Sequence, residues 1–286
     1  MTEGDVEPGA RPAPGGVLLT VAYDGGGYAG YAPQPGQATI AGTLLAAVQS
    51  IDPAVTEVRG ASRTDAGVHA RGQRVAFDTR CDLGPRAWAL ALARALPATI
   101  AVRAASLVPA GLHPRFAARR KHYRYLVLAS PVRDPHWEGR AWRLAGLASG
   151  RALGLMQREL AAAVGTHAFG AFRSSADTRA GVERTIDLAL VRPVADGHGG
   201  GALRAGQGDR HATLVAIDIV GTAFLHRMVR ILVGTAVDVA RDRLARGAIT
   251  RALASGDRRD AGVTAPAHGL YLESIELALA GADSWP

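Results

Sequence analysis

The sequence predicts an α+β fold of two tandem ferredoxin-like (βαββαβ) units, each with an antiparallel sheet that carries helices on one face. Two observations lead to this prediction. Short segments with a period of two alternate with longer segments of helical period, and the same order occurs twice, from Val17 to Val108 and again from Lys121 onward. The 286 residues, 48% of them hydrophobic, suffice to bury both cores. We expect the open sheet faces to form a shared central cleft.

The first unit is expected to run strand, helix, strand, strand, helix, strand. Its strands are short runs rich in β-branched and aromatic residues, and its helices carry apolar residues at helical spacing. In chain order the six segments are Val17 to Tyr23, Thr39 to Ile51, Val55 to Ala61, Gln73 to Thr79, Gly84 to Leu96, and Ile100 to Val108.

The second unit repeats this order. Its segments are His122 to Ala129, Leu147 to Val164, Thr185 to Val191, Ala212 to Gly221, Leu225 to Leu244, and Leu270 to Leu279. A short helix near Ile249 is an addition to the repeat. The Gly-rich segment 195–210 lies between two of the strands, and we expect it to be a loop.

The division into domains follows from composition. The segment "GLHPRFAARR", residues 111–120, carries Pro, Gly and several basic residues where the first unit ends. We therefore expect domains over 17–113 and 114–280, with tails at 1–16 and 281–286. The first tail is acidic and then Pro/Gly-rich, without an apolar core segment, so it is expected to be disordered and not a signal peptide.

Charge and cysteine content limit the possible functions. A formal net charge of +8 favours a polyanionic partner. Since Lys121 is the only lysine, arginine supplies nearly all of this charge, either through coding bias or because guanidinium groups suit phosphates. Cys81 is the only cysteine, which excludes an intramolecular disulfide and a multi-cysteine zinc site. Charged residues interrupt the longest apolar run, Ile217 to Val239, so we expect a soluble, cytoplasmic protein without a membrane segment.

The loop "YDGGGYAGYAPQPGQ" contains Gly25, Gly27 and Gly30 in a G-x-G-x-x-G pattern. A dinucleotide-binding loop must open a helix at once, yet Pro33 and Pro35 follow and no helical period resumes before about Thr39. A nicotinamide or flavin site is therefore not expected. The glycines either allow close approach to a ligand or make a flexible connection.

The segment "SRTDAGVHARGQ", residues 62–73, places a single carboxylate, Asp65, among basic residues. Asp-x-Gly is common in turns, so this side chain could simply cap its own backbone. An arginine within about 4 to 6 Å, however, keeps a carboxylate ionised, the state that a nucleophile or general base needs near neutral pH. The sequence leaves both interpretations open.

The segment "KHYRYLVLA" places Tyr123 and Tyr125 on one face of a strand and His122 and Arg124 on the other. Packing in the core is the more common fate of such tyrosines. The alternative is that the ring nearer the boundary, Tyr123, stacks on a nucleobase, an interaction of roughly 1 to 3 kcal/mol.

The segment "FLHRMVRILVGTAVDVA" predicts an amphipathic helix with Arg230 at the margin of its apolar stripe and Arg227 facing away. A marginal arginine usually reaches out to water. If the stripe packs beneath a cleft, however, Arg230 is partly buried and needs an anion, for which Asp65 is the candidate.

Taken in order, these blocks resemble the tRNA pseudouridine synthase A family. The resemblance runs from about Val17 to Leu279 and includes the glycine loop, "RTDAGVHA" with "GQRVAFDT", "LPATIAV", "HPRFAARRKHYRY", "FLHRMVRILVG" and "TAPAHGLYL". The octet "RTDAGVHA" is its most specific block.

The resemblance implies an isomerase without cofactor or metal that converts uridine to pseudouridine in the anticodon stem-loop of tRNA, at nucleotides thirty-eight to forty. Asp65 matches the catalytic aspartate, Tyr123 the tyrosine that packs against the target base, and Arg230 the arginine paired with the acid. Arg63 matches an arginine that holds the flipped nucleotide. The family acts as a homodimer whose basic clefts receive tRNA.

The chemistry agrees with these roles, because the isomerisation moves one proton and needs no redox carrier. Asp65 could attack C6 of the base, attack C1′ of the ribose, or take a proton from C2′, and the sequence does not choose among these. We expect Leu270 to contact the substrate as well, and phosphates to be bound by Arg119, Arg120, Lys121, Arg173 and His226.

The sequence also departs from the family pattern. Tyr31 and Ala32 stand where Trp-Gln is common, Ser62 replaces the usual Gly, and Ala93 occupies a position that is often Asn. These changes affect the expected fit of the RNA and not the proposed catalytic groups. The alternative function is a non-catalytic RNA-binding protein with the same duplicated fold.

Overall fold

The first half of the chain forms antiparallel strands and two helices. In chain order these are β1 (Gly15–Tyr23), α1 (Ile40–Gln49), β2 (Arg59–Gly60), β3 (His69–Thr79), α2 (Pro85–Ala95) and β4 (Ile100–Val108). The hydroxyl of Thr39 accepts a hydrogen bond from the amide of Gly42 and caps α1, while Pro85 occupies the first turn of α2. The computed structural model describes residues 15–177, 181–194, 213–279 and 284–285.

The second half adds the remaining elements. They are α3 (Pro114–Ala117), β5 (Ala118–Ala129), β6 (Trp142–Arg143), α4 (Gly150–Ala161), β7 (Gly165–Ala168), β8 (Glu183–Val194), β9 (Thr213–Gly221), α5 (Met228–Ala240), α6 (Ala248–Ser255), β10 (Leu270–Leu277) and β11 (Ser284–Trp285). Short 3-10 turns occupy Gly170–Phe172, Arg258–Asp260 and Ala267–Gly269.

All these strands belong to one continuous sheet, so the protein is a mixed α/β structure. The order is β11-β4-β1-β3-β10-β5-β9-β8-β7, with β2 paired to β3 and β6 to β5. The two halves meet where β10 lies parallel to β3, with Tyr271 opposite His69 and Leu272 opposite Ala70. The sequence did not indicate this junction, because it depends on a pairing between residues 202 positions apart in the chain.

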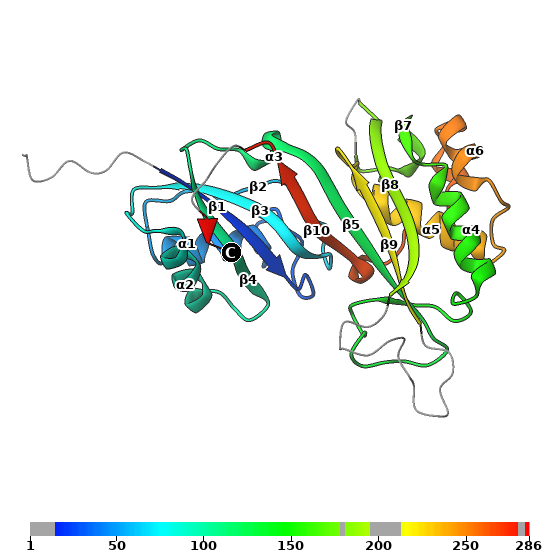
Figure 1. Ribbon diagram of the computed structural model, residues 1–286, viewed down its shortest axis with the longest axis horizontal. Helices are drawn as coiled ribbons and strands as arrows, with labels where there is room; N and C mark the ends of the chain where they lie inside the picture. Colours follow the sequence, from blue (N-terminus) through cyan, green and yellow to red (C-terminus); the bar gives the residue numbers. More distant parts are fainter. Residues whose placement is uncertain (1–14, 178–180, 195–212, 280–283, 286) are drawn as a thin grey trace, which may run out of the picture.

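The helices of both halves pack on the same face of this sheet. Figure 1 shows α1 and α2 over one half and α4, α5 and α6 over the other, with β10 and β5 between the two groups. A row of paired residues crosses five strands on this face and belongs to the same apolar core as the helices: Tyr23, Ala70, Leu272, Tyr123 and Ile219. We expected a cleft on the helix-free faces. The cleft described below opens instead on the helix-bearing face, between the two helix groups.

Several expected boundaries differ from the structure. The strand expected from Val55 to Ala61 is reduced to β2, because only Arg59 and Gly60 pair with β3. The helix expected from Leu225 begins at Met228 and ends at Ala240. Gly15 and Gly16 belong to β1 and not to a tail, and Ser284 and Trp285 pair with β4. The expected tail over 1–14 and the loop over 195–210 lie outside the described residues.

Candidate nucleotide-binding and active-site cleft

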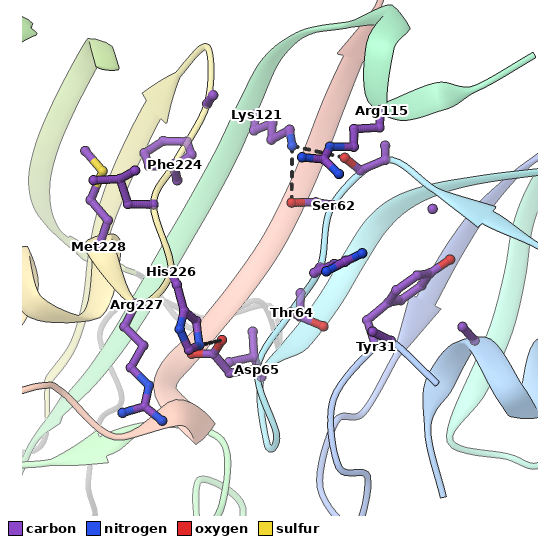
Figure 2. A pocket seen from close by; sticks show the side chains of 18 of the residues that line it. Tyr31, Ser62, Thr64, Asp65, Arg115, Lys121, Phe224, His226, Arg227 and Met228 are labelled. Carbon is purple, nitrogen blue, oxygen red and sulfur yellow. Dashed lines mark hydrogen bonds and ion pairs between the residues drawn. The ribbon is translucent and has the colours of Figure 1, made fainter. Parts of the chain in front are cut away.

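A cleft of about 1110 Å³ lies between the two halves of the molecule. Its first wall is formed by residues of the segments 29–37 and 57–68, and its second by the segment 222–230 at the beginning of α5. Side chains from β5 and the start of β10 lie between these walls: Ala118, Lys121, Tyr123 and Leu270. Figure 2 shows Asp65 entering the cleft from the first wall, with His226 and Arg227 on the second.

Asp65 is held across the cleft by two basic side chains of the second half. Nη1 of Arg230 donates to Oδ2 of Asp65 over 2.8 Å, and Nε2 of His226 lies 3.1 Å from Oδ1 (Figure 2 shows the latter contact). Nε of Arg230 also donates to the carbonyl of Ala265, which fixes the plane of the guanidinium group. The carboxylate of Asp65 thus accepts a charge-assisted hydrogen bond from Arg230 and does not cap its own loop.

The loop that carries Asp65 is fixed at several points by the first half. The amide group of Gln73 donates to the carbonyl of Ser62 over 2.6 Å and accepts from its N–H over 3.2 Å. The hydroxyl of Thr64 lies 2.8 Å from that of Tyr23, and the N–H of Tyr31 donates to the carbonyl of Thr64 over 3.0 Å. Backbone held in this way gives the carboxylate a defined position.

The glycines of the first loop allow it to pack against the loop of Asp65. Gly30 has φ +100°, and a Cβ there would lie 2.8 Å from the carbonyl oxygen of Thr64. A Cβ on Gly25 would lie 2.1 Å from the carbonyl oxygen of Val68. Because α1 starts only at Ile40, this loop does not open a helix directly. Its glycines therefore allow close contact between this loop and the loop of Asp65.

Tyr123 lies at the edge of the apolar core and also lines the cleft. Its side chain is buried, and the ring of Phe224 meets it edge-on at a centroid distance of 5.1 Å. Its hydroxyl lies 3.0 Å from that of Ser62. Burial raises the pKa of Tyr123 to about 12, so the phenol is protonated near neutral pH. Core packing and exposure to the cleft therefore coexist at this residue, and its stacking role stays a prediction.

Lys121, expected to bind phosphate, has protein partners in the structure. Its ammonium group donates to the carbonyl of Ala61 over 3.0 Å and to the hydroxyl of Ser62 over 3.3 Å (Figure 2). Burial, together with the charge of Arg115, lowers the pKa of Lys121 to about 8. These contacts link β5 directly to the loop of Asp65.

The other expected substrate contacts divide into two groups. Arg63 and Leu270 line the cleft, with Arg63 exposed and Leu270 buried. Three expected phosphate contacts, Arg119, Arg120 and Arg173, are not among the residues that line it. Nε of Arg120 lies 3.3 Å from Oδ2 of Asp187. The RNA-binding roles of all five residues stay predictions.

The structure also brings residues to the cleft that the sequence did not indicate. Arg227 lines it, although it was expected to face away, because α5 begins after this residue and Arg227 has φ 63°. Arg115 of α3 and Phe224 line the cleft as well. A Cβ at position 60 would lie 2.3 Å from the hydroxyl oxygen of Tyr31, so the packing of Tyr31 requires glycine there.

Two features are absent from the residues that the structure describes. Among those residues, no group of three or more His, Cys, Asp and Glu side chains is arranged to hold a metal ion. In the same segments, none of the helices combines the length and apolar character needed to cross a bilayer.

Comparison with known proteins points to one family. The model of the tRNA pseudouridine synthase family matches residues 19–117 and 160–276. The tRNA pseudouridine synthase A of Moorella thermoacetica is 36% identical over 266 residues, which cover 91% of this chain and 98% of that protein. The protein of the same name from Citrifermentans bemidjiense is 36% identical over 261 residues, covering 91% and 96%. That from Halalkalibacterium halodurans is 36% identical over 256 residues, covering 89% of both chains.

Proposed function

The chain belongs to the tRNA pseudouridine synthase family, and we propose that it converts uridine to pseudouridine in the anticodon stem-loop of tRNA, at nucleotides thirty-eight to forty. The observation that carries this proposal is the carboxylate of Asp65, fixed 2.8 Å from Arg230 inside a cleft large enough for an extruded nucleotide. A cavity of about 1110 Å³ exceeds the upper end of the range of roughly 300 to 1,000 Å³ for small-ligand pockets, and this fits a nucleotide with part of its RNA strand.

The residues around Asp65 take the roles of a base-flipping enzyme. The uridine leaves its stack at a cost of a few kcal/mol, which contacts with the ring of Tyr123 offset in part. Arg63, exposed at the cleft, occupies the place that the base leaves. Asp65 acts on the nucleotide, the bond between N1 and C1′ breaks, the uracil turns, and a new bond forms between C5 and C1′. The C5 proton is lost and N1 takes up a proton, so the product is an isomer of the substrate. Arg230 keeps the carboxylate oriented during these steps.

Binding of tRNA is electrostatic in large part. With a formal net charge of +8, the chain attracts a polyanion, and Arg115, Arg227 and His226 lie on the walls of the cleft. Such contacts make the affinity fall steeply with salt. We also propose that the protein acts in the cytoplasm, as its cysteine content favours, and as a homodimer, as the family resemblance implies.

We also propose that the fold consists of two tandem ferredoxin-like units. The strand orders β4-β1-β3-β2 and β10-β5-β9-β8 are equivalent, and within each set every neighbouring pair is antiparallel. This equivalence supports two ferredoxin-like units, one from each half of the chain.

Mapping of the modified nucleotides tests this function. Unmodified tRNA transcripts are incubated with the protein, and pseudouridine is located by sequencing after chemical labelling. We expect product at nucleotides thirty-eight to forty, and none there in a transcript whose uridines at these positions are replaced by cytidine. Product at other uridines alone would correct the proposed site. Tight binding of tRNA without any product would identify the protein as a non-catalytic RNA-binding protein.

A further inference from the structure

Three polar groups form a connected chain behind the candidate active site. The ammonium group of Lys121 lies 3.3 Å from the hydroxyl of Ser62, and this hydroxyl lies 3.0 Å from that of Tyr123. The chain spans both halves of the molecule, because Lys121 and Tyr123 stand on β5 whereas Ser62 precedes Asp65 in its loop. Lys121 and Tyr123 are two positions apart on one strand, so both side chains point to the same face.

The chemistry of the three groups determines which of them donates each hydrogen bond. An ammonium group only donates hydrogen bonds, so Lys121 occupies a lone pair of the Ser62 oxygen. Donation from a charged group polarises the serine hydroxyl and strengthens its own donation to the next acceptor. That acceptor is the oxygen of Tyr123, which leaves the hydrogen of Tyr123 available to the cleft.

On these grounds, and resting on the proposed function, we propose that Lys121 is a positioning residue that orients the hydroxyl of Tyr123 through Ser62 so that it donates a hydrogen bond to the target base. A uracil ring offers carbonyl oxygens as acceptors for such a donor. A glycine at position 62 has no hydroxyl and could not fill this role.

Burial of the Lys121 ammonium group is energetically unfavourable, and this supports a role for it in the site. It is the only lysine of the chain, and burial lowers its pKa, so its charge is held in an unfavourable place. A lysine that served only to attract phosphate would be better placed in solvent, as are the guanidinium groups of Arg119 and Arg120 on the same strand. The contact with the carbonyl of Ala61 also fixes the loop at its first residue.

A double-mutant cycle with Lys121→Met and Ser62→Ala tests the proposal. Each single variant is expected to lower the single-turnover rate of pseudouridine formation by about 10-fold, the scale of one lost hydrogen bond. Because both substitutions act on the same hydroxyl, the rate of the double variant is expected to be no lower than that of the less active single variant. In the background of Tyr123→Phe, Ser62→Ala is expected to change the rate less than twofold. Binding of tRNA by the Lys121 and Ser62 variants is expected to stay within twofold of wild type.

The control is Arg86→Gln, which removes one exposed cation of α2 outside the cleft and is expected to retain the wild-type rate. Losses that multiply in the double variant would overturn the proposal, as would an unchanged rate in both single variants. Weaker tRNA binding by Lys121→Met, with a smaller salt dependence, would show that Lys121 binds phosphate instead. Ser62→Ala removes a single oxygen and keeps the test decisive should Lys121→Met fail to fold. An inactive wild-type protein would overturn the proposed function itself.

Discussion

Arg230 and Asp65 are 165 positions apart in the chain, yet Nη1 of the arginine lies 2.8 Å from Oδ2 of the aspartate. The two residues come from opposite halves, since Asp65 precedes β3 and Arg230 lies in the first turn of α5. Only 14% of the Arg230 side chain and 21% of the Asp65 side chain are exposed, so this ion pair is poorly screened by water. The candidate site therefore exists only when both halves are folded and joined.

The substitution Arg230→Lys tests whether this geometry, and not charge alone, is needed. Lysine retains the positive charge but cannot bind the Ala265 carbonyl and the Asp65 carboxylate with a planar fork. We expect the rate of pseudouridine formation to fall by about 100-fold, the scale of roughly 3 kcal/mol of lost transition-state stabilisation. Single-turnover assays measure this rate, and filter binding is expected to show unchanged tRNA affinity. A rate within threefold of wild type would show that any cation suffices.

Substitutions of Tyr123 separate its ring from its hydroxyl. Tyr123→Phe retains a surface for stacking, whereas Tyr123→Leu loses it, so affinity for a substrate with a flipped base is expected to fall in the order Tyr, Phe, Leu. The step from Phe to Leu is expected to be about 1 kcal/mol or more, within the range for stacking on a base. Titrations with a tRNA that carries a fluorescent base at the target position give these affinities. Equal losses in the two variants would assign the main role to the hydroxyl.

The pH dependence of the rate is expected to report on Lys121. The pKa of Lys121 is lowered to about 8 by burial and by Arg115, so its hydrogen bond to Ser62 is charge-assisted below this pH and weaker, without the charge, above it. The wild-type rate is therefore expected to fall as the pH rises through about 8, whereas Ser62→Ala lacks this decline. Single-turnover rates at a series of pH values give both profiles. A decline of the same size in Ser62→Ala would assign it to another group.

Asp218 is expected to stabilise the sheet behind the active site. Burial opposes its ionisation, but hydrogen bonds from His122 and Arg124 outweigh this effect and lower its pKa to about 2. A depressed pKa contributes stability at neutral pH that is lost as the pH falls from about 4 toward 2. Asp218→Asn is expected to lower the free energy of unfolding by about 2 kcal/mol at pH 7, with the difference vanishing near the acid end of this window.

Urea unfolding at neutral and acid pH measures this contribution. The matched control is Asp257→Asn, because the ion pair of Asp257 with its exposed neighbour Arg259 should matter little for stability. Equal stabilities of wild type and Asp218→Asn at neutral pH would contradict the assignment.

Much of the local structure could be predicted from residue patterns. The strand β4 occupies Ile100–Val108, as its alternating apolar residues indicated, and the helices α1 and α2 end within two residues of their predicted limits. The segment around β2 was predicted less well. Val55, Thr56 and Val58 are β-branched, which favoured a strand, but only Arg59 and Gly60 pair with β3. Such pairing is a property of the folded sheet.

The candidate site could be predicted where one sequence motif contains the reactive residue and its basic neighbours, as in the loop of Asp65. Arg230 could be linked to Asp65 because its place on the margin of an apolar stripe called for an anion. The partners of Lys121 could not be predicted, since they depend on how β5 lies against a loop 60 positions earlier. The same holds for Arg227, whose side chain reaches the cleft because α5 starts three residues later than its apolar pattern suggested.

The measurement that bears most directly on the account is the single-turnover rate of Asp65→Asn on unmodified tRNA. Asparagine keeps the shape of the side chain and can still accept a hydrogen bond from Arg230, but it cannot act as a nucleophile or base. We expect no detectable pseudouridine from this variant, together with tRNA affinity within a few fold of wild type, while the wild-type protein modifies the same transcript. Product formation by Asp65→Asn at a rate comparable to wild type would show that this carboxylate does not carry out the reaction.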